Sequence, residues 1–374
     1  MTKVLIASDS FKGSATSLEV GNYLEKGIKK ADPLAKVYKY GVADGGEGTV
    51  LSITDALKGK FIKSTVTGPL GEKVSANWGI VENKTAIIEV AETSGITLIS
   101  DRLNPLKTTT YGVGELIKLA LDAGVNKIYI GLGGSATNDG GLGMAQALGM
   151  KFLDKFEQEL PFGGGSLDKL IKIDDSNLDK RLNKVEIVAL SDVKNPLIGK
   201  NGASFIFGPQ KGASVEQVKL LDRNLANLAD KTSKFLGHDF SKVPGAGAAG
   251  GIGFGLMSFC NAKIESGIDT IMNIIHLNQP MKKVDLVITG EGQIDGQSLM
   301  GKVPIGVAKL AKKFNLPVIA VAGSIGSNIE DVYKSGINLV LSTTTSPMSL
   351  SEAIESTPKL LEDVGYTAYK AFII

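Results

Sequence analysis

Short apolar runs alternate with amphipathic spans toward both ends of the chain. Apolar runs bounded by glycine, proline or short polar residues predict buried strands. The predicted strands cover residues 4–7, 37–42, 61–67, 284–288, 317–322 and 339–342. Apolar positions at helical spacing predict helices between them, at residues 17–30, 49–58 and 304–314. Strands that alternate with helices in this way are typical of a parallel sheet with both faces covered.

The middle of the chain follows a different pattern. Residues 78–81 and 85–90 predict a hairpin or meander, and the other elements predicted here are strands at 127–130 and 185–190 and a long helix at 215–236. Because the two ends look alike and the middle differs, we predict two α/β domains. Residues 1–70 and 283–374 form a doubly wound domain, and residues 71–282 are inserted into it. We expect the ligand cleft between the two domains.

The composition excludes several classes of protein. The 374 residues carry a net charge of +2, so no strong field attracts nucleic acid or an anionic membrane. The single cysteine, Cys260, excludes an internal disulfide and a cysteine-based zinc site. The first apolar run turns polar at Ser8, too early for a secretory signal, and no apolar run is long enough to cross a bilayer. We expect a cytoplasmic protein without nucleic-acid or membrane partners, and its oligomeric state is not predicted.

A glycine-rich loop at residues 131–141, with the sequence GLGGSATNDGG, follows a predicted strand and precedes a predicted helix. Open α/β sheets bind ligands at the carboxyl ends of strands, and glycines let backbone N–H groups approach an anion. Ser135, Thr137 and Asn138 add short polar side chains, and Asp139 adds the only charge. The loop therefore suits a phosphate and its metal ion. The alternative is a tight turn in which glycine only permits a positive φ.

Three other loops place charged side chains after predicted strands. Asp9 and Lys12 follow the first strand, where a lysine either reaches a phosphoryl group or is simply solvated. Asp44 and Glu47 share a glycine loop after the second strand, and they either bind Mg²⁺ or a hydroxyl, or form a turn before a helix. Asp192 follows the strand at 185–190, a position that suits a catalytic carboxylate or a turn-forming aspartate.

The last third of the chain contains two more glycine segments. Residues 243–255 contain GAGAAG, but no strand precedes them, so we predict a flexible hinge or a loop that faces the ligand. Glu291 and Asp295 lie in a predicted loop after the strand at 284–288, as a carboxylate pair fit for a metal ion or for proton abstraction. Residues 296–303 nearly match the pattern G-x-x-x-x-G-K-[ST], but the last hydroxyl is missing and the segment starts too far beyond the strand. We reject that pattern and keep Lys302 as a candidate phosphate contact.

Together these loops resemble those of the bacterial glycerate kinases of the glycerate 2-kinase type. The resemblance rests on six segments in the same order: DSFKGS at 9–14, ADGGEGT at 43–49, TTTYG at 108–112, GLGGSATNDGG at 131–141, GAAGGIGFG at 247–255 and TGEGQID at 289–295. It extends over essentially the whole chain. It implies ATP-dependent phosphorylation of D-glycerate to a phosphoglycerate, with 2-phosphoglycerate the expected product and the 3-position the open alternative. It also implies a flavodoxin-like α/β domain with a parallel sheet and, inserted into it, an α/β domain with a mixed sheet.

Phosphoryl transfer requires a phosphate cradle, a divalent metal ion, a cation near the transferred group and an acceptor hydroxyl in line with it. The residues that we assign to the nucleotide phosphates are Gly133, Gly134, Ser135, Thr137 and Asn138. The expected Mg²⁺ ligands are Asp44, Glu291 and Asp295. Lys12 would neutralise the transferred group, and Asp192 would accept the proton of the glycerate hydroxyl. The residues assigned to the substrate are Asp9, Ser10, Ser94 and Lys302, and the cation that binds the glycerate carboxylate stays open.

Two other functions are open from the residues alone. Residues 131–136 fit G-x-G-x-x-A after a strand, with Asp154 about 20 residues further on, as in a nicotinamide-dependent oxidoreductase of a small hydroxy acid. Against that function, residues 138–141 interrupt the helix that should begin at the pyrophosphate. The other alternative is a non-catalytic sugar-acid binding protein, although the loops carry more acids and lysines than binding alone requires.

Overall fold

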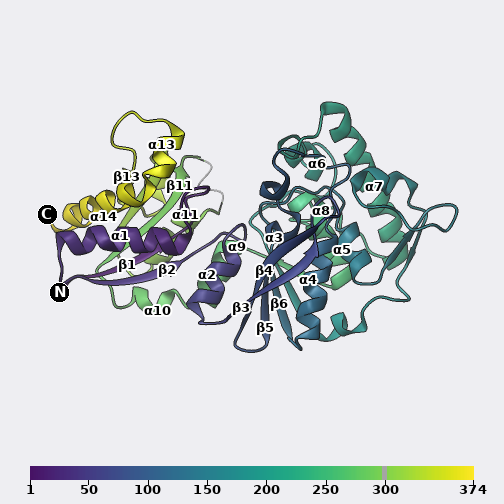
Figure 1. Ribbon diagram of the computed structural model, residues 1–374, viewed down its shortest axis with the longest axis horizontal. Helices are drawn as coiled ribbons and strands as arrows, with labels where there is room; N and C mark the ends of the chain where they lie inside the picture. Colours follow the sequence, from purple (N-terminus) through teal and green to yellow (C-terminus); the bar gives the residue numbers. More distant parts are fainter. Residues whose placement is uncertain (297–300) are drawn as a thin grey trace. The chain divides into compact units, whose positions relative to one another are not determined.

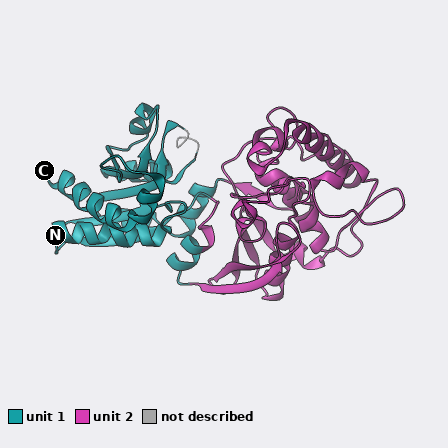
Figure 2. Cartoon of the chain, turned by 45° about the horizontal axis from the view of Figure 1, so that its top comes forward, with its two compact units in different colours: residues 1–44, 51–58, 266–374 teal, residues 45–50, 59–265 magenta. Residues whose placement is uncertain are grey.

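The computed structural model describes residues 1–296 and 301–374. Within them the chain folds into two compact units, coloured teal and magenta in Figure 2. Unit 1 comprises residues 1–44, 51–58 and 266–374, and unit 2 comprises residues 45–50 and 59–265. Unit 1 is thus assembled from segments that lie before and after most of unit 2 in the sequence.

The bounds of the units differ from the expected bounds at residues 70 and 282. β3 (Lys60–Thr67) pairs along its whole length with β4 (Lys73–Val81), so it belongs to unit 2. α9 (Gly267–Ile274) packs on α11 (Val303–Lys312), so it belongs to unit 1. Strand pairing and helix packing decide both bounds, and neither is visible in a local sequence pattern.

Unit 1 contains one parallel sheet with the strand order β13-β12-β11-β1-β2 (Figure 1). Its strands are β1 (Lys3–Ser8), β2 (Lys36–Gly41), β11 (Leu286–Ile294), β12 (Val318–Ile325) and β13 (Leu339–Ser342). When the strands are numbered within unit 1, this is the flavodoxin-like order 2-1-3-4-5. Successive side chains of β1 point to opposite faces and are nearly all buried, so both faces of the sheet are covered. The predicted doubly wound, flavodoxin-like sheet is confirmed.

The other helices of unit 1 are α1 (Ser17–Ala31), α10 (Asn278–Met281), α12 (Glu330–Lys334), α13 (Leu350–Glu355) and α14 (Thr357–Ile373), while α2 (Thr49–Ala56) begins in unit 2 and continues into unit 1. α1 begins with the predicted capping box: Thr16 N donates to Glu19 Oε2 at 2.8 Å, and Glu19 N donates to Thr16 Oγ1 at 3.3 Å. α1 and α14 lie side by side (Figure 1). Gly27 permits this close packing, because a Cβ there would lie 1.9 Å from the Glu362 carbonyl oxygen.

Unit 2 contains a mixed sheet with the strand order β10-β9-β6-β5-β4-β3. Its other strands are β5 (Thr85–Glu89), β6 (Lys127–Gly131), β9 (Glu186–Leu190) and β10 (Lys263–Glu265), and a separate hairpin pairs β7 (Lys151–Leu153) with β8 (Lys172–Asp174). β3, β4 and β5 run antiparallel to one another, whereas β5, β6, β9 and β10 are parallel. The predicted mixed sheet and the hairpin at residues 78–90 are confirmed.

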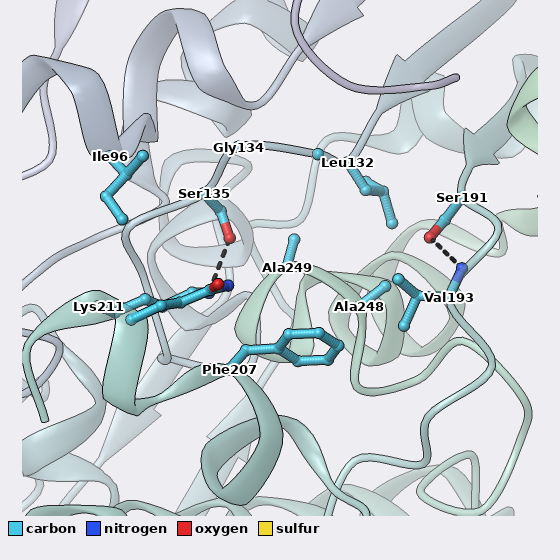
Figure 3. Close-up of a pocket in the computed structure, with 12 residues that line it drawn as sticks. Ile96, Leu132, Gly134, Ser135, Ser191, Val193, Phe207, Lys211, Ala248 and Ala249 are labelled. Atoms are coloured by element: carbon cyan, nitrogen blue, oxygen red, sulfur yellow. Dashed lines mark hydrogen bonds between the residues drawn. The ribbon is translucent and has the colours of Figure 1, made fainter. Parts of the chain in front are cut away.

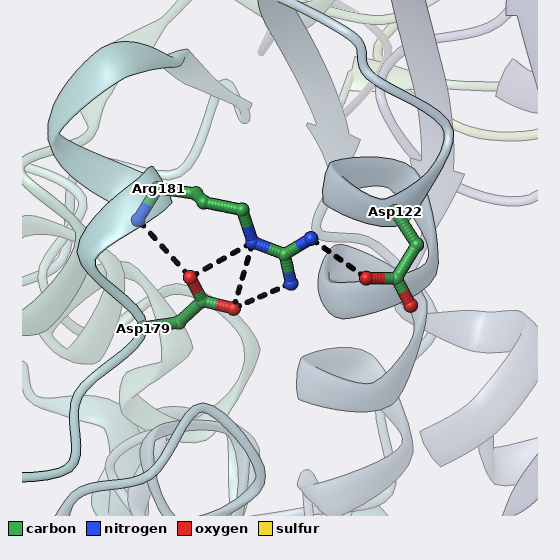
Figure 4. A network of polar contacts seen from close by, with 3 residues as sticks. All are labelled: Asp122, Asp179 and Arg181. Carbon is green, nitrogen blue, oxygen red and sulfur yellow. Dashed lines mark hydrogen bonds and ion pairs between the residues drawn. The ribbon is translucent and has the colours of Figure 1, made fainter.

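The helices of unit 2 are α3 (Ala91–Ser94), α4 (Tyr111–Asp122), α5 (Leu142–Ala147), α6 (Ala203–Phe207), α7 (Val215–Leu236) and α8 (Ala248–Cys260), with short 3-10 helices η1 (Ile96–Ile99), η2 (Gly164–Lys169), η3 (Lys180–Lys184) and η4 (Pro209–Lys211). Figure 4 shows how Arg181 joins η3 to the end of α4. Its Nη1 donates to Asp122 Oδ1 at 2.7 Å, and its Nη2 donates to Asp179 Oδ2 at 2.7 Å. The network is largely exposed, so we expect it to stabilise the fold by about 1 kcal/mol at most.

Two predicted loops differ in the structure. β11 does not end at residue 288 but continues to Ile294, because residues 289–294 pair with β12, so Glu291 lies in a strand. The expected flexible segment at 243–255 instead leads into α8, whose Phe254 and Leu256 are buried. α8 is interrupted at Ala249, Gly250 and Gly251, which have φ values of 54°, 69° and 94°. In the part of the chain that the structure describes, no helix is both long and apolar enough to cross a membrane.

Candidate functional site

The first group of site residues lies at the carboxyl ends of the central strands of unit 1. Doubly wound sheets bind ligands where the strand order reverses, which here is between β1 and β11. Asp9 directly follows β1, and its N–H donates to the carbonyl oxygen of Gly290 in β11 at 2.9 Å. Asp44 lies just beyond β2, and Glu291 lies within β11. The fold thus collects three carboxylates at this edge from segments far apart in the sequence.

The carboxylates of this group influence one another strongly. Asp9 is 9% exposed, and its Oδ1 accepts a hydrogen bond from Ser10 N at 2.7 Å. The pKa of Asp9 is raised to about 7, chiefly by burial and also by the charges of Asp44 and Glu291, while Ser10 N–H and Lys12 act in the opposite direction. Asp9 therefore retains its proton up to near neutral pH, and a hard divalent cation bound beside it would favour the ionised carboxylate.

Two lysines accompany these acids. Lys302 Nζ lies 3.4 Å from Glu291 Oε2 and immediately precedes α11. Lys12 lies in a turn in which Phe11 N donates to Ala15 O at 2.8 Å, and its charge acts on Asp9. Residues 297–300 of the rejected nucleotide-binding pattern lie outside the described residues.

The expected metal ligands are only partly assembled. Among residues 1–296 and 301–374, no three histidine, cysteine, aspartate or glutamate side chains are grouped closely enough to hold a metal ion by themselves. Asp44 and Glu291 both act on Asp9, whereas Asp295 follows the end of β11 and accepts a hydrogen bond from Gln293 Nε2 at 3.2 Å. Mg²⁺ commonly uses one or two carboxylates and completes its shell with water and phosphate oxygens, so the residues present fit it. The assignment of all three ligands stays a prediction.

The second group of site residues belongs to the glycine-rich loop of unit 2. Gly133 N donates to Gly45 O at 3.0 Å, and a Cβ on Gly133 would lie 2.5 Å from Gly46 Cα. On its other side, the loop forms a bridge in which Ile96 N donates to Gly134 O at 2.9 Å and Ala136 N donates to Ser94 O at 2.8 Å. The glycines are therefore required both for close packing and for the positive φ of 77° at Gly134.

Asp139, the only charge of the glycine-rich loop, holds the loop together. Its fully buried carboxylate accepts hydrogen bonds from Thr110 N at 3.0 Å, Thr110 Oγ1 at 2.9 Å, Gly141 N at 3.0 Å and Gly143 N at 3.3 Å. Burial raises the pKa of Asp139, although these four donors favour the ionised form. The expectation that this carboxylate faces a phosphate and its metal ion is therefore replaced by a structural role. It also explains the TTTYG segment, which supplies Thr110.

A pocket of about 280 Å³ opens beside the glycine-rich loop, entirely within unit 2 (Figure 3). It is lined by Ile96, Leu132, Gly133, Gly134, Ser135, Ser191, Val193, Phe207, Gln210, Lys211, Ala248 and Ala249. Figure 3 shows Ser135 and Lys211 together on one side, with Val193 and Ala248 on the other. The cation of Lys211 thus lies on one side of the pocket, and the other side carries the apolar Val193 and Ala248 together with the Ser191 hydroxyl.

Lys211 is a site residue that the sequence did not indicate. It is 2% exposed, and its Nζ donates to Ser135 Oγ at 2.8 Å and to Thr137 O at 2.7 Å. Burial lowers the pKa of Lys211 to about 7, while the charge of Asp139 acts in the opposite direction. A lysine that follows Gly208-Pro209-Gln210 has no local pattern that separates it from a surface lysine, so only the tertiary structure identifies it.

The predicted phosphate-binding residues divide into two sets. Gly133, Gly134 and Ser135 line the pocket. Thr137 and Asn138 are fully buried, and Asn138 Oδ1 accepts a hydrogen bond from Ser204 Oγ at 3.2 Å. Within the described residues, Thr137 Oγ1 and Asn138 Nδ2 have no hydrogen-bond partner.

The remaining predicted residues of unit 2 lie at or near the same pocket. Asp192 is half-buried and lies between Ser191 and Val193, which both line it. Ser94 is fully buried, and its hydroxyl donates to Thr109 O at 3.0 Å, so it is positioned as a support for the glycine-rich loop.

The oxidoreductase alternative finds no support in the geometry of unit 2. Asp154, the expected ribose ligand, accepts hydrogen bonds from Phe156 N at 2.8 Å and Gln158 N at 2.9 Å, so it stabilises a turn after β7. α5 begins only at Leu142, after left-handed glycines at 140 and 141, so no helix N-terminus follows Gly133 directly.

Comparisons with known proteins agree with the sequence resemblance. The model of the glycerate kinase family matches residues 4–372. The glycerate kinase of Bacillus subtilis (strain 168) is 48% identical over 362 residues, which are 96% of this chain and 95% of that protein. The glycerate 2-kinase of Escherichia coli (strain K12) is 50% identical over 353 residues, which are 94% and 93% of the two chains.

A solved structure agrees as well. The crystal structure of a protein described as glycerate kinase 2, from Salmonella typhimurium LT2, superposes with a TM-score of 0.87 at 43% sequence identity. The match covers 100% of this chain and 98% of that one. The chain therefore belongs to the glycerate kinase family, whose members are enzymes that transfer a phosphoryl group to an alcohol.

Proposed function

We propose that this enzyme transfers the terminal phosphoryl group of ATP, in the presence of Mg²⁺, to the 2-hydroxyl of D-glycerate and releases ADP and 2-phosphoglycerate. Family membership supports glycerate as the acceptor, and the relative from Escherichia coli is named for the 2-position. The observation that carries the nucleotide part is the pocket of unit 2, in which the glycine-rich loop, a buried lysine and an apolar wall meet. ATP-dependent chemistry also fits the cytoplasmic location expected from the sequence.

The pocket has the two chemical surfaces that a nucleoside triphosphate requires. Val193, Phe207 and Ala248 supply apolar contacts for the flat base. Gly133, Gly134 and Ser135 line the same space, and because Gly133 N already donates to Gly45 O, the Ser135 hydroxyl is the donor of this loop that we assign to the phosphate oxygens. Thr137 and Asn138 support that loop from beneath in this proposal.

The acidic edge of unit 1 would hold the metal ion and the acceptor. Mg²⁺, when bound, neutralises charge on the phosphate oxygens and orients them. Asp44, Glu291 and Asp295 would be its protein ligands. Lys12 would face the transferred phosphoryl group, and Asp9, Ser10 and Lys302 would contact glycerate. Transfer needs groups from both units in one reaction.

The decisive experiment measures ADP release from ATP, Mg²⁺ and D-glycerate, with the product identified by phosphorus NMR. The proposal expects ADP that depends on glycerate and a single resonance of 2-phosphoglycerate. L-glycerate and a reaction without acceptor serve as controls. A 3-phosphoglycerate product would overturn the regiochemistry, and a folded enzyme without glycerate-dependent ADP would overturn the proposed reaction.

Asp192 is the proposed proton acceptor for the glycerate hydroxyl. Asp192→Asn should reduce kcat by about 10²-fold or more, because the amide no longer accepts the proton. The KM of this variant for ATP should change little. Initial rates at varied ATP and saturating D-glycerate would measure it. Turnover near that of the wild type would remove Asp192 from this role and direct the search to Asp9.

A further inference from the structure

Lys211 is the only charged residue among the described residues that line the pocket of unit 2. It ends η4, and Gly212 turns the chain away directly after it with a φ of 89°. The side chain is almost completely buried, yet its ammonium reaches the wall of the pocket beside Ser135 (Figure 3). A buried cation at the edge of a pocket is an expensive arrangement that packing alone does not require.

The hydrogen bonds of Lys211 leave donors available on this wall. An ammonium has three N–H donors, and two of them go to Ser135 Oγ and Thr137 O. Because Ser135 Oγ accepts from Lys211, its own proton is free to point toward a ligand. The wall therefore offers a positive charge and an oriented hydroxyl at the same place.

The charge of Lys211 is incompletely balanced in the protein itself. The titratable group that faces it among the described residues is Asp139, which acts on it electrostatically. The carboxylate of Asp139, however, is occupied by four donors from Thr110, Gly141 and Gly143. In consequence the ammonium has no direct carboxylate partner in the described part of the chain, and a bound anion would supply one.

We propose that Lys211 is a phosphate-binding residue of the nucleotide site and that its ammonium, together with the Ser135 hydroxyl that it orients, binds the polyphosphate of ATP. This assignment rests on the proposed use of ATP. It predicts a proton linkage: burial lowers the pKa of Lys211 to about 7, and an anion bound beside the ammonium favours the charged form again. ATP binding at pH 8 should therefore be accompanied by proton uptake, since the terminal phosphate, with a pKa of about 6, is already ionised.

The test measures the affinities of ATP and adenosine for the full-length enzyme by calorimetry without Mg²⁺, in two buffers of different ionisation enthalpy at pH 8. Lys211→Met keeps the length of the side chain and removes the charge. It should weaken ATP binding at least about tenfold, change adenosine binding less than about twofold, and abolish proton uptake. Ser135→Ala should also weaken ATP binding selectively but retain the uptake. Lys200→Met, an exposed lysine of unit 2, is the matched control and should match the wild type.

The outcomes distinguish phosphate binding by Lys211 from a purely structural role in the glycine-rich loop. If Lys211→Met weakens adenosine and ATP equally, the lysine only braces the glycine-rich loop and the proposal is overturned. If the variant does not fold, the selectivity of Ser135→Ala still decides, and a Ser135→Ala variant that weakens ATP and adenosine equally contradicts the assignment. Failure of the proposed function itself is visible separately, as wild-type enzyme that binds ATP but releases no ADP with glycerate.

Discussion

Glu89, the last residue of β5, shows how one buried side chain supports a loop of the site. Its carboxylate accepts hydrogen bonds from Val50 N and, at 3.2 Å, from Gly48 N, at the start of α2. Val50 precedes Glu89 by 39 residues in the sequence, and Gly48 precedes it by 41. The pKa of Glu89 is raised to about 8, chiefly by burial and also by Glu92 and Glu47, while the two backbone donors oppose the shift.

This shift predicts a pH-dependent stability. The folded pKa of about 8 exceeds the ordinary value of 4.5, so the folded state holds the proton more tightly than the unfolded state does. The contribution of Glu89 to stability is therefore complete below pH 4.5 and is lost as the pH rises through 8. As the pH rises through this window, the ionisation of Glu89 should lower the free energy of unfolding by up to about 4 kcal/mol.

Denaturant unfolding of the wild type and of Glu89→Gln between pH 5 and pH 8.5 would measure this contribution. Glu89→Gln should flatten the decline with pH, and Glu82→Gln, in the exposed turn after β4, should not. Parallel curves for the wild type and Glu89→Gln would show that Glu89 is ionised throughout and that its backbone donors outweigh burial.

At the scale of elements, the interrupted start of α8 and the glycine-rich loop are packed backbone to backbone. Gly250 has a left-handed backbone conformation with a φ of 69°, and its carbonyl oxygen accepts a hydrogen bond from Gly140 N at 3.1 Å. A Cβ at Gly250 would lie 1.9 Å from Thr137 O, the same carbonyl that accepts from Lys211. The start of α8 thus determines the position of the loop that lines the pocket.

Gly250→Ala should therefore damage both stability and nucleotide binding. The strain of a positive φ costs about 1 kcal/mol, and the collision with Thr137 adds at least as much again. Gly237→Ala is the matched control, because Gly237 has a φ of 71° and no atom within 4 Å of the added Cβ. We expect Gly250→Ala to lower the free energy of unfolding by about 2–4 kcal/mol and to weaken ATP binding, and Gly237→Ala to cost about 1 kcal/mol with unchanged binding. Equal losses in the two variants would contradict the packing argument.

At the scale of the whole molecule, the two units carry different chemistry. Unit 2 contains the pocket with the glycine-rich loop and Lys211, and unit 1 contains the acidic edge with Asp9, Asp44 and Glu291. Each unit builds its part of the site at the carboxyl ends of parallel strands, as open α/β sheets generally do. The division predicts that the two substrates protect different segments of the chain.

Hydrogen–deuterium exchange of the full-length enzyme would test this division. ATP without Mg²⁺ should slow exchange most at residues 131–141 and 245–255 of unit 2, because bound phosphates restrain backbone N–H groups there. Residues 9–15 and 286–294 of unit 1 should respond chiefly when D-glycerate and Mg²⁺ are added. Adenosine provides the control for contacts with the base alone. Protection by ATP confined to unit 1 would contradict the assignment of the nucleotide to the pocket of unit 2.

The sequence by itself determined the features that depend on neighbours along the chain. The predicted strands at 4–7 and 127–130, the helix at 215–236, the capping box of Thr16 and the position of the glycine-rich loop all agree with the structure. The resemblance of six loops also identified the family, which the comparisons confirm. These features were accessible because periodicity, capping and motif spacing are local properties.

Only the tertiary structure decided which partner each segment meets. β11 extends to Ile294 because β12 pairs with it, and β3 joins unit 2 because β4 does. Asp139 has a structural role because Thr110, Gly141 of the loop and Gly143 of α5 all donate to it, although its position suggested a ligand-facing charge. Lys211 entered the site from a segment 74 residues beyond its partner Thr137. Such contacts arise from burial and packing between distant segments, so they leave no trace in the local pattern of a single sequence.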